Sequence, residues 1–190
     1  MIQRYKHIFY SVIGKHAEES IESILSRKRE EINACGYTLW SARIDKKSVD
    51  AVWNIPHNSK VAVLCHVSQI ARDPIIVEGS KPYCASTLIG PDGETRPVPD
   101  GIRTTFTRGA NYQAYVVKDI KVLNKTIDYD FQGYESTLAT GEKRTFKERF
   151  EGFNRFQNTY GVYNKELAGA CSKEISVVML LQYPFVVNIK

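Results

Sequence analysis

The sequence predicts an α+β domain in which helices flank a strongly curved mixed β-sheet or a small β-barrel. Three observations lead to this prediction. The first is one convincing amphipathic helix near the N-terminus, and the second is a series of segments rich in β-branched and aromatic residues. The third is a middle region, residues 73–109, whose many glycines and prolines favour tight turns between short strands. The 190 residues contain no linker or internal repeat, so we expect one domain spanning residues 1–190.

The N-terminal segment predicts a strand, a helix and a second strand. Residues 7–13 have the β-branched and aromatic composition of a strand. In residues 17–35 the apolar side chains recur at spacings of three, four and seven, which places them on one helix face. Gly36 is the expected end of this helix, because glycine adopts the left-handed conformation at low cost. Residues 37–44 then predict a strand with Leu39 and Trp40 on opposite faces.

The later elements are predicted from apolar runs and turn signals. A helical turn is expected at residues 48–53. Buried strands are expected at residues 60–67, 113–123 and 174–187, with shorter β segments at residues 75–77, 86–89 and 103–107. Residues 90–93 predict a hairpin turn, and Pro184 predicts an edge or a bend in the last strand. Phenylalanines at helical spacing in residues 143–160 predict a helix or loop–helix whose aromatic face packs inward, whereas residues 129–134 receive no assignment.

The composition is that of an ordinary globular protein with a modest positive charge. Hydrophobic residues make up 43% of the chain and charged residues 25%, with a formal net charge of +5. This balance is compatible with a polyanionic partner but does not require one. No apolar run approaches the roughly 18 residues that cross a bilayer, and the apolar run near the N-terminus is too short for a signal peptide. We therefore expect a cytoplasmic protein without membrane association.

No motif identifies a catalytic activity. The four histidines lack the HxH or HExxH spacing that places two imidazoles on one metal ion, and the four cysteines show no CxxC pair. Cys65 and His66 are adjacent, so on a strand they face opposite sides and cannot readily pair as nucleophile and base. No catalytic residue, metal ligand or cofactor is predicted. Acidic residues such as Asp128 and Asp130 keep a small hydrolase or nuclease-like enzyme open as an alternative.

Aromatic residues beside basic ones form the more informative pattern. Proteins that bind nucleic acid stack bases on flat side chains and meet phosphates with lysine and arginine. The candidate nucleic-acid-binding residues are Tyr37, Trp40, Arg43, Trp53, Arg103, Arg108, Asn111 and Tyr112. A tryptophan on a strand such as Trp40 is more often a core residue than part of a ligand cage. The segment 103–112 has no evident core role, which makes it the sharper prediction of a site.

The stretch formed by Gly36, Tyr37, Leu39 and Trp40, placed after a strand and a helix, resembles the PUA-like superfamily with its EVE, YTH and ASCH branches. Residues 103–115 match it more loosely, and the similarity in element order covers most of the chain. The chain lacks the full set of cage tryptophans of the YTH pattern and a clear ASCH-type GxKxxE signature. The resemblance implies a small curved barrel whose pocket holds an RNA base or a flipped, modified DNA base.

The sequence therefore leads to the hypothesis of a nucleic-acid-binding domain. Trp40 and Tyr112 are the expected stacking groups, and Arg43, Arg103 and Arg108 are the expected donors to phosphates or base edges. Besides the enzyme alternative, a protein-interaction module without a small ligand stays open, because an apolar strand such as residues 113–123 can be presented to a partner protein. The choice between RNA and DNA and the oligomeric state are both left open.

Overall fold

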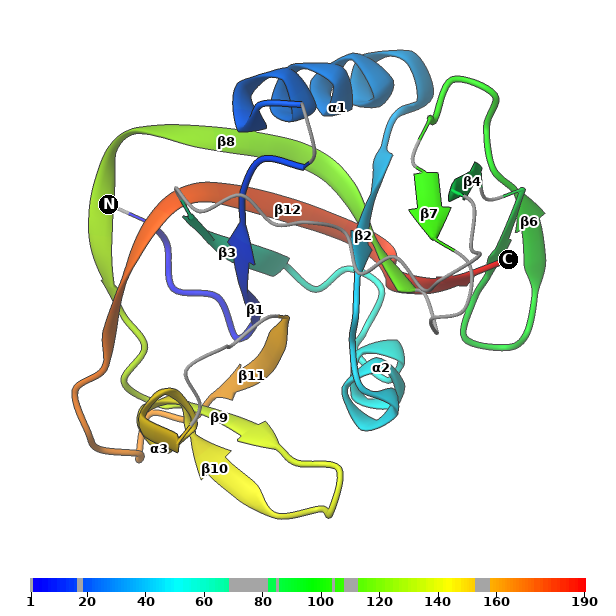
Figure 1. Ribbon diagram of the computed structural model, residues 1–190. Helices are drawn as coiled ribbons and strands as arrows, with labels where there is room; N and C mark the ends of the chain where they lie inside the picture. The colour runs from blue at the N-terminus through cyan, green and yellow to red at the C-terminus, as the bar shows by residue number, and fades with distance from the viewer. Residues whose placement is uncertain are drawn as a thin grey trace.

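The fold is organised around two long bent strands, β8 (Gln113–Asp130) and β12 (Ser172–Ile189), which pair antiparallel over most of their length. A computed structural model describes residues 2–16, 19–68, 82–84, 86–103, 105–107, 113–152 and 158–190. Within these residues the protein is an α+β fold with one large, mostly antiparallel sheet and three helices. Figure 1 shows β8 and β12 curving together across the molecule.

The other strands extend from this pair. On one side β12 pairs with β3 (Val61–Val67), and β3 runs parallel to β1 (His7–Ile13). Beyond β1 the order continues through β11 (Thr159–Tyr163), β9 (Tyr134–Thr137) and β10 (Lys143–Thr145). The far edge of β8 pairs with β2 (Thr38–Ala42), and the end of β12 pairs with β5 (Thr87–Ile89), which pairs with β6 (Thr95–Pro97). A separate two-stranded sheet consists of β4 (Pro82–Cys84) and β7 (Thr105–Thr107).

The sheet is mixed and curved, as the sequence predicted. The parallel β1–β3 pair is set among antiparallel neighbours, and this is what makes the sheet mixed. The pairings among the described strands form a branched path that does not close on itself. The barrel alternative is therefore not confirmed. No helix in the described ranges is long and apolar enough to span a membrane.

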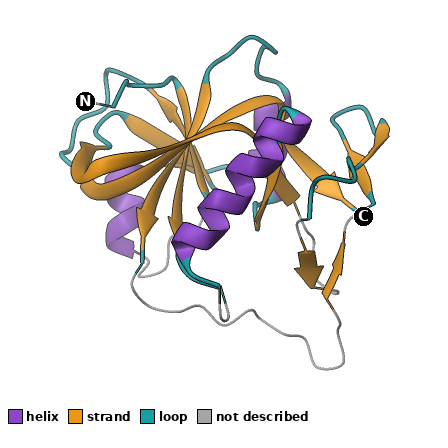
Figure 2. Ribbon diagram, turned by 90° about the horizontal axis from the view of Figure 1, so that it is seen from above, coloured by secondary structure: helices purple, strands orange, loops and turns teal. Residues whose placement is uncertain are grey.

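The first helix, α1 (Ile21–Cys35), crosses one face of the sheet (Figure 2). It begins later than the predicted residue 17, because the Ser20 side chain caps it by accepting a hydrogen bond from the backbone N–H of Ser23 at 3.2 Å. The predicted end is confirmed. Gly36 has a left-handed φ of 82°, and its N–H donates to the carbonyl of Ile32.

The other two helices differ more from their predictions. The second, α2 (Lys46–Trp53), starts earlier than expected because the Asp45 carboxylate accepts from the N–H of Ser48. The third, α3 (Phe146–Gly152), falls within the predicted helix or loop–helix of residues 143–160 but begins later, since residues 143–145 pair with β9 as strand β10. Phe146 is fully buried, as predicted for the aromatic face. Phe153 and Phe156 lie outside the described residues, as does the predicted β segment 75–77.

Two local features place the sites described below. The predicted hairpin turn at residues 90–93 is confirmed, with the N–H of Gly90 donating to the carbonyl of Glu94 at 2.9 Å. The predicted bend at Pro184 is a bulge. Leu181 of β12 pairs with Val117 of β8 and Val186 pairs with Tyr115, so residues 182–185 stand opposite a single residue of β8.

Strand β2 separates two hydrophobic clusters. Leu39 is fully buried in a small cluster with Leu88 and Val116, whereas Trp40 packs against the largest cluster, which contains Phe9 and Tyr115. The predicted placement of Leu39 and Trp40 on opposite faces is therefore confirmed. Side chains on the two faces of β2 therefore lie in two different environments.

Candidate nucleic-acid interface

Trp40 lies on the face of β2 that meets the main core. In the antiparallel ladder it stands directly opposite Tyr115 of β8, and residues opposite each other project to the same face. Trp40 is half-buried, and it packs against the main core. Tyr115 is fully buried beside it. This arrangement holds the indole in place while leaving some of its surface available for a ligand.

A hydrogen-bonded group of side chains surrounds the hydroxyl of Tyr115. Its centre is Asn158, whose Oδ1 accepts from Tyr115 Oη at 3.1 Å and from Ser11 Oγ at 3.0 Å. The Asn158 Nδ2 donates to the carbonyl of Arg43 at 3.4 Å. Asn158 has a φ of 60°, the left-handed region that non-glycine residues seldom adopt and that occurs at functional sites. One side chain thus links β1, β8, the start of β11 and the end of β2.

Burial keeps the tyrosine and histidine side chains on this face uncharged at neutral pH. Burial raises the pKa of Tyr115 well above its ordinary value, and Cys65 adds to the effect, so the phenol stays a hydrogen-bond donor. Burial also raises the pKa of Tyr160, whose hydroxyl lies 2.8 Å from Nδ1 of His7. The pKa of His7 is lowered, first by burial and then by Lys6. At neutral pH the hydrogen bond between them therefore joins a neutral phenol and an uncharged imidazole.

Arg43 follows β2 directly and is exposed. Its backbone is tied to Asn158, but its guanidinium makes no hydrogen bond or ion pair with any described residue. A charged group on an anchored backbone suits contact with a phosphate. Of the predicted set, Trp40 stands opposite Tyr115 and Arg43 contributes its backbone carbonyl to the same hydrogen-bonded group.

Trp53 and Tyr37 lie elsewhere. The Trp53 indole Nε1 donates to the carbonyl of Val186 at 2.8 Å, and the half-buried ring packs on the main core. That contact gives Trp53 a structural role, holding the end of α2 against β12. Tyr37 precedes β2 and lines a cavity together with Leu88 and Val116, on the Leu39 side of the strand. Neither residue joins Trp40 at one site.

Arg103 is exposed, and its backbone is anchored. Its N–H donates to Oε1 of Glu31 at 3.0 Å, and the buried Glu31 also accepts from Lys28 Nζ at 3.2 Å and from the hydroxyl of Thr38. Burial lowers the pKa of Lys28 to about 8, against the opposing effect of Glu31. This network ties α1 to β2 and to the start of the 103–112 segment. Arg108, Asn111 and Tyr112 lie outside the described residues, so their roles stay predictions.

Sequence reasoning missed Asn158, Ser11 and Tyr115. The only local signal is that asparagine tolerates the left-handed conformation better than most residues. Its partners are 147, 115 and 43 positions away, so no spacing in the sequence reveals them. In the part of the chain that the structure describes, no group of three or more His, Cys, Asp or Glu side chains is placed to hold a metal ion.

Comparison with protein-family models, with curated proteins and with solved structures finds no match to this chain. The functional assignment therefore depends on the geometry of the site itself.

Proposed function

We propose that the protein binds nucleic acid and holds an unpaired or flipped base against Trp40. The observation that carries this proposal is a half-buried tryptophan directly opposite Tyr115, whose hydroxyl bonds to Asn158. Trp40 stands opposite Tyr115, and Asn158 connects Tyr115 to Arg43. A flat ring, an amide and a free guanidinium are the three kinds of group that contact the face of a base, its edge and its phosphate.

Each of these groups contacts a different part of the nucleotide. Stacking a base on an aromatic side chain contributes about 1–3 kcal/mol. Asn158 uses one N–H of its Nδ2 in the bond to Arg43, which leaves the other N–H for an acceptor on the base edge. Arg43 meets a neighbouring phosphate, and the net charge of +5 adds a long-range attraction that salt screens.

Kinship with the PUA-like superfamily is part of the same proposal. It is supported by the order of strand, capped helix and β2 strand carrying Trp40, and by the curved mixed sheet. The more specific proposal is that the base is held within a small barrel, in a pocket next to Trp40.

The experiment uses the intrinsic fluorescence of Trp40. The chain has two tryptophans, so Trp53→Phe leaves Trp40 as the sole indole reporter. This protein is titrated with single-stranded RNA and with DNA carrying modified cytosines, at low and at high salt. We expect Trp40 emission to be quenched at about micromolar protein and the apparent affinity to fall with salt.

The matched control is Trp40→Phe, in which Trp53 is the only reporter. Its ring is held by the bond to Val186, so its emission should stay unchanged when nucleic acid is added. Absence of binding by every oligonucleotide at low salt overturns the proposal. Equal quenching in both single-tryptophan proteins also overturns it, because Trp40 is then not the contact.

A further inference from the structure

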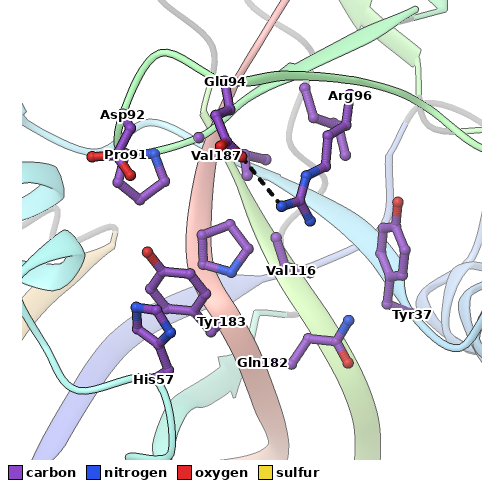
Figure 3. Close-up of a pocket in the computed structure, with 13 residues that line it drawn as sticks. Tyr37, His57, Pro91, Asp92, Glu94, Arg96, Val116, Gln182, Tyr183 and Val187 are labelled. Carbon is purple, nitrogen blue, oxygen red and sulfur yellow. Dashed lines mark hydrogen bonds and ion pairs between the residues drawn. The ribbon is translucent and has the colours of Figure 1, made fainter.

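A concave site lies on the opposite face of β2 from Trp40. It is a cavity of about 310 Å³ between the β5–β6 hairpin, Tyr37 and the β12 bulge (Figure 3). Sites for small molecules occupy roughly 300–1,000 Å³, so this cavity is at the small end of that range. Its base is apolar and includes Leu88, Val116 and Val187. It has room for a compact ring system.

Aromatic rings stand on two sides of the cavity. Figure 3 shows Tyr37 on one side and Tyr183 on the other. Tyr183 belongs to the bulge and stacks on His57, with ring centroids 3.6 Å apart and planes 23° apart. The imidazole therefore covers one face of the Tyr183 ring, which is part of the cavity wall. Walls of this kind suit a flat ligand, which gains from stacking and from burial of its apolar faces.

Polar groups at the rim present a donor and an acceptor side by side. The guanidinium of Arg96 points into the space between the aromatic walls and pairs with the Glu94 carboxylate at 3.4 Å (Figure 3). Their side chains are 74% and 68% exposed, so both keep free hydrogen-bonding capacity. Burial raises the pKa of Tyr37, Cys35 adds to the effect and Arg96 opposes it, so the phenol remains a donor at neutral pH.

The charge at the rim selects against phosphate. Asp92 and Glu94 supply two carboxylates and Arg96 one guanidinium, so acidic groups outnumber basic ones. Gln182 adds a neutral amide that both donates and accepts. A neutral ligand with its own donors and acceptors fits this rim better than an anion does.

We propose that this cavity binds an oxopurine base of the guanine class, presented as a nucleoside without phosphate. The Arg96 guanidinium donates to O6 of the base, and the Glu94 carboxylate accepts from the N1–H and the 2-amino group. The purine ring lies between Tyr37 and Tyr183. Adenine presents an amino group to Arg96 and a bare N1 to Glu94, which leaves both protein groups without a hydrogen-bond partner on the base. This site is separate from the Trp40 surface and takes a different ligand.

The test is isothermal titration calorimetry of the full chain with guanosine, inosine, adenosine and guanosine monophosphate. We expect guanosine to bind with a dissociation constant below about 1 mM. Inosine lacks the 2-amino group and should bind more weakly than guanosine. Adenosine should bind at least about tenfold more weakly, because the hydrogen bonds to O6, N1–H and the 2-amino group are all lost. The monophosphate should bind more weakly than guanosine, because its charge meets Asp92 and Glu94.

Arg96→Gln should weaken guanosine binding about tenfold. Its matched control is Arg144→Gln, because Arg144 pairs with Glu142 at 3.2 Å two positions away, as Arg96 pairs with Glu94. The control should bind guanosine like the parent protein. No guanosine binding at about 1 mM, equal affinity for adenosine, or equal losses in the two arginine variants overturns the proposal. Tighter binding of the monophosphate also overturns it, and would assign the cavity to nucleotides.

Discussion

The two faces of β2 present two kinds of surface from one short strand. On the Trp40 face the polar groups are largely buried and already hydrogen-bonded to one another, with Asn158 joining Tyr115, Ser11 and Arg43. On the Tyr37 face the polar groups are exposed charges on a hairpin. A pre-formed buried network suits a surface that positions one ring, whereas exposed charges suit recognition of a hydrogen-bonding pattern.

The largest expected effect is a loss of unfolding free energy when the buried Lys28–Glu31 pair, which supports both faces of β2, is broken. Glu31→Gln removes the carboxylate that pairs with Lys28 behind β2, where the two side chains are 4% and 5% exposed. An ammonium group left without its charged partner in such a place costs about 3–5 kcal/mol of unfolding free energy. Urea unfolding measures the loss.

Asp50→Asn is the control for Glu31→Gln. It breaks the exposed pair between Lys46 and Asp50, whose 2.7 Å separation is shorter than that of the buried pair. Its cost should stay below about 1 kcal/mol, because water screens the charges. Similar losses in the two variants would show that Glu31 does not hold the two faces together.

The next largest effects are expected from two variants that test ligand binding on each face of β2 separately. Trp40→Leu removes the stacking surface, so oligonucleotide binding should weaken by about 10- to 100-fold, while guanosine binding stays as in the parent. Tyr37→Leu should do the reverse. Fluorescence anisotropy with a labelled oligonucleotide and calorimetry with guanosine measure the two affinities. If each variant lowers both affinities alike, the faces are not independent sites.

Alkaline pH should lower the free energy of unfolding, because the Trp40 face contains buried tyrosines. Burial raises the pKa of Tyr115 and of Tyr160 in the folded protein, whereas both ionise near pH 10 when the chain unfolds. The stabilisation is complete below about pH 10 and is lost as pH rises further, by about 1.4 kcal/mol per pH unit for each tyrosine. Urea midpoints between pH 9 and 11 should fall, and Tyr115→Phe should make the fall shallower. An unchanged slope in that variant would contradict the account.

Acid should have the smallest effect. The pKa of His7 is lowered in the folded protein, mainly by burial, so the unfolded chain takes up a proton first as pH falls below about 6.5. Stability present above that pH is lost below it, by less than about 1.4 kcal/mol per pH unit because His7 is only half-buried. His7→Gln should flatten the urea midpoint between pH 7 and 5. A slope that His7→Gln leaves intact would assign the acid effect to carboxylates instead.

Local signals predicted the features that depend on neighbouring residues. Gly36 marked the helix end, the alternation of Leu39 and Trp40 gave the faces of β2, and residues 90–93 gave the turn beside the cavity. The helical spacing of phenylalanines misled at residues 143–145, where pairing with β9 outweighed the local pattern.

Features that depend on distant partners could not be predicted. Asn158 acts through residues on three other strands or strand ends, and Glu31 receives the N–H of Arg103 from 72 positions away. The cavity exists because the bulge at residues 182–185 meets a hairpin roughly half the chain away. Only the folded register brings these groups together.

The most direct test of the central claim follows the indole N–H signals of the protein by ¹⁵N-correlated NMR. Trp53→Phe assigns the two signals, one from Trp40 and one from Trp53. Single-stranded oligonucleotide should shift the Trp40 indole signal and leave that of Trp53, whose Nε1 is bonded to Val186, in place. If the oligonucleotide instead shifts the methyl signals of Leu88 and Val187 and leaves Trp40 unmoved, nucleic acid binds at the Tyr37 cavity and the proposed role of Trp40 is wrong.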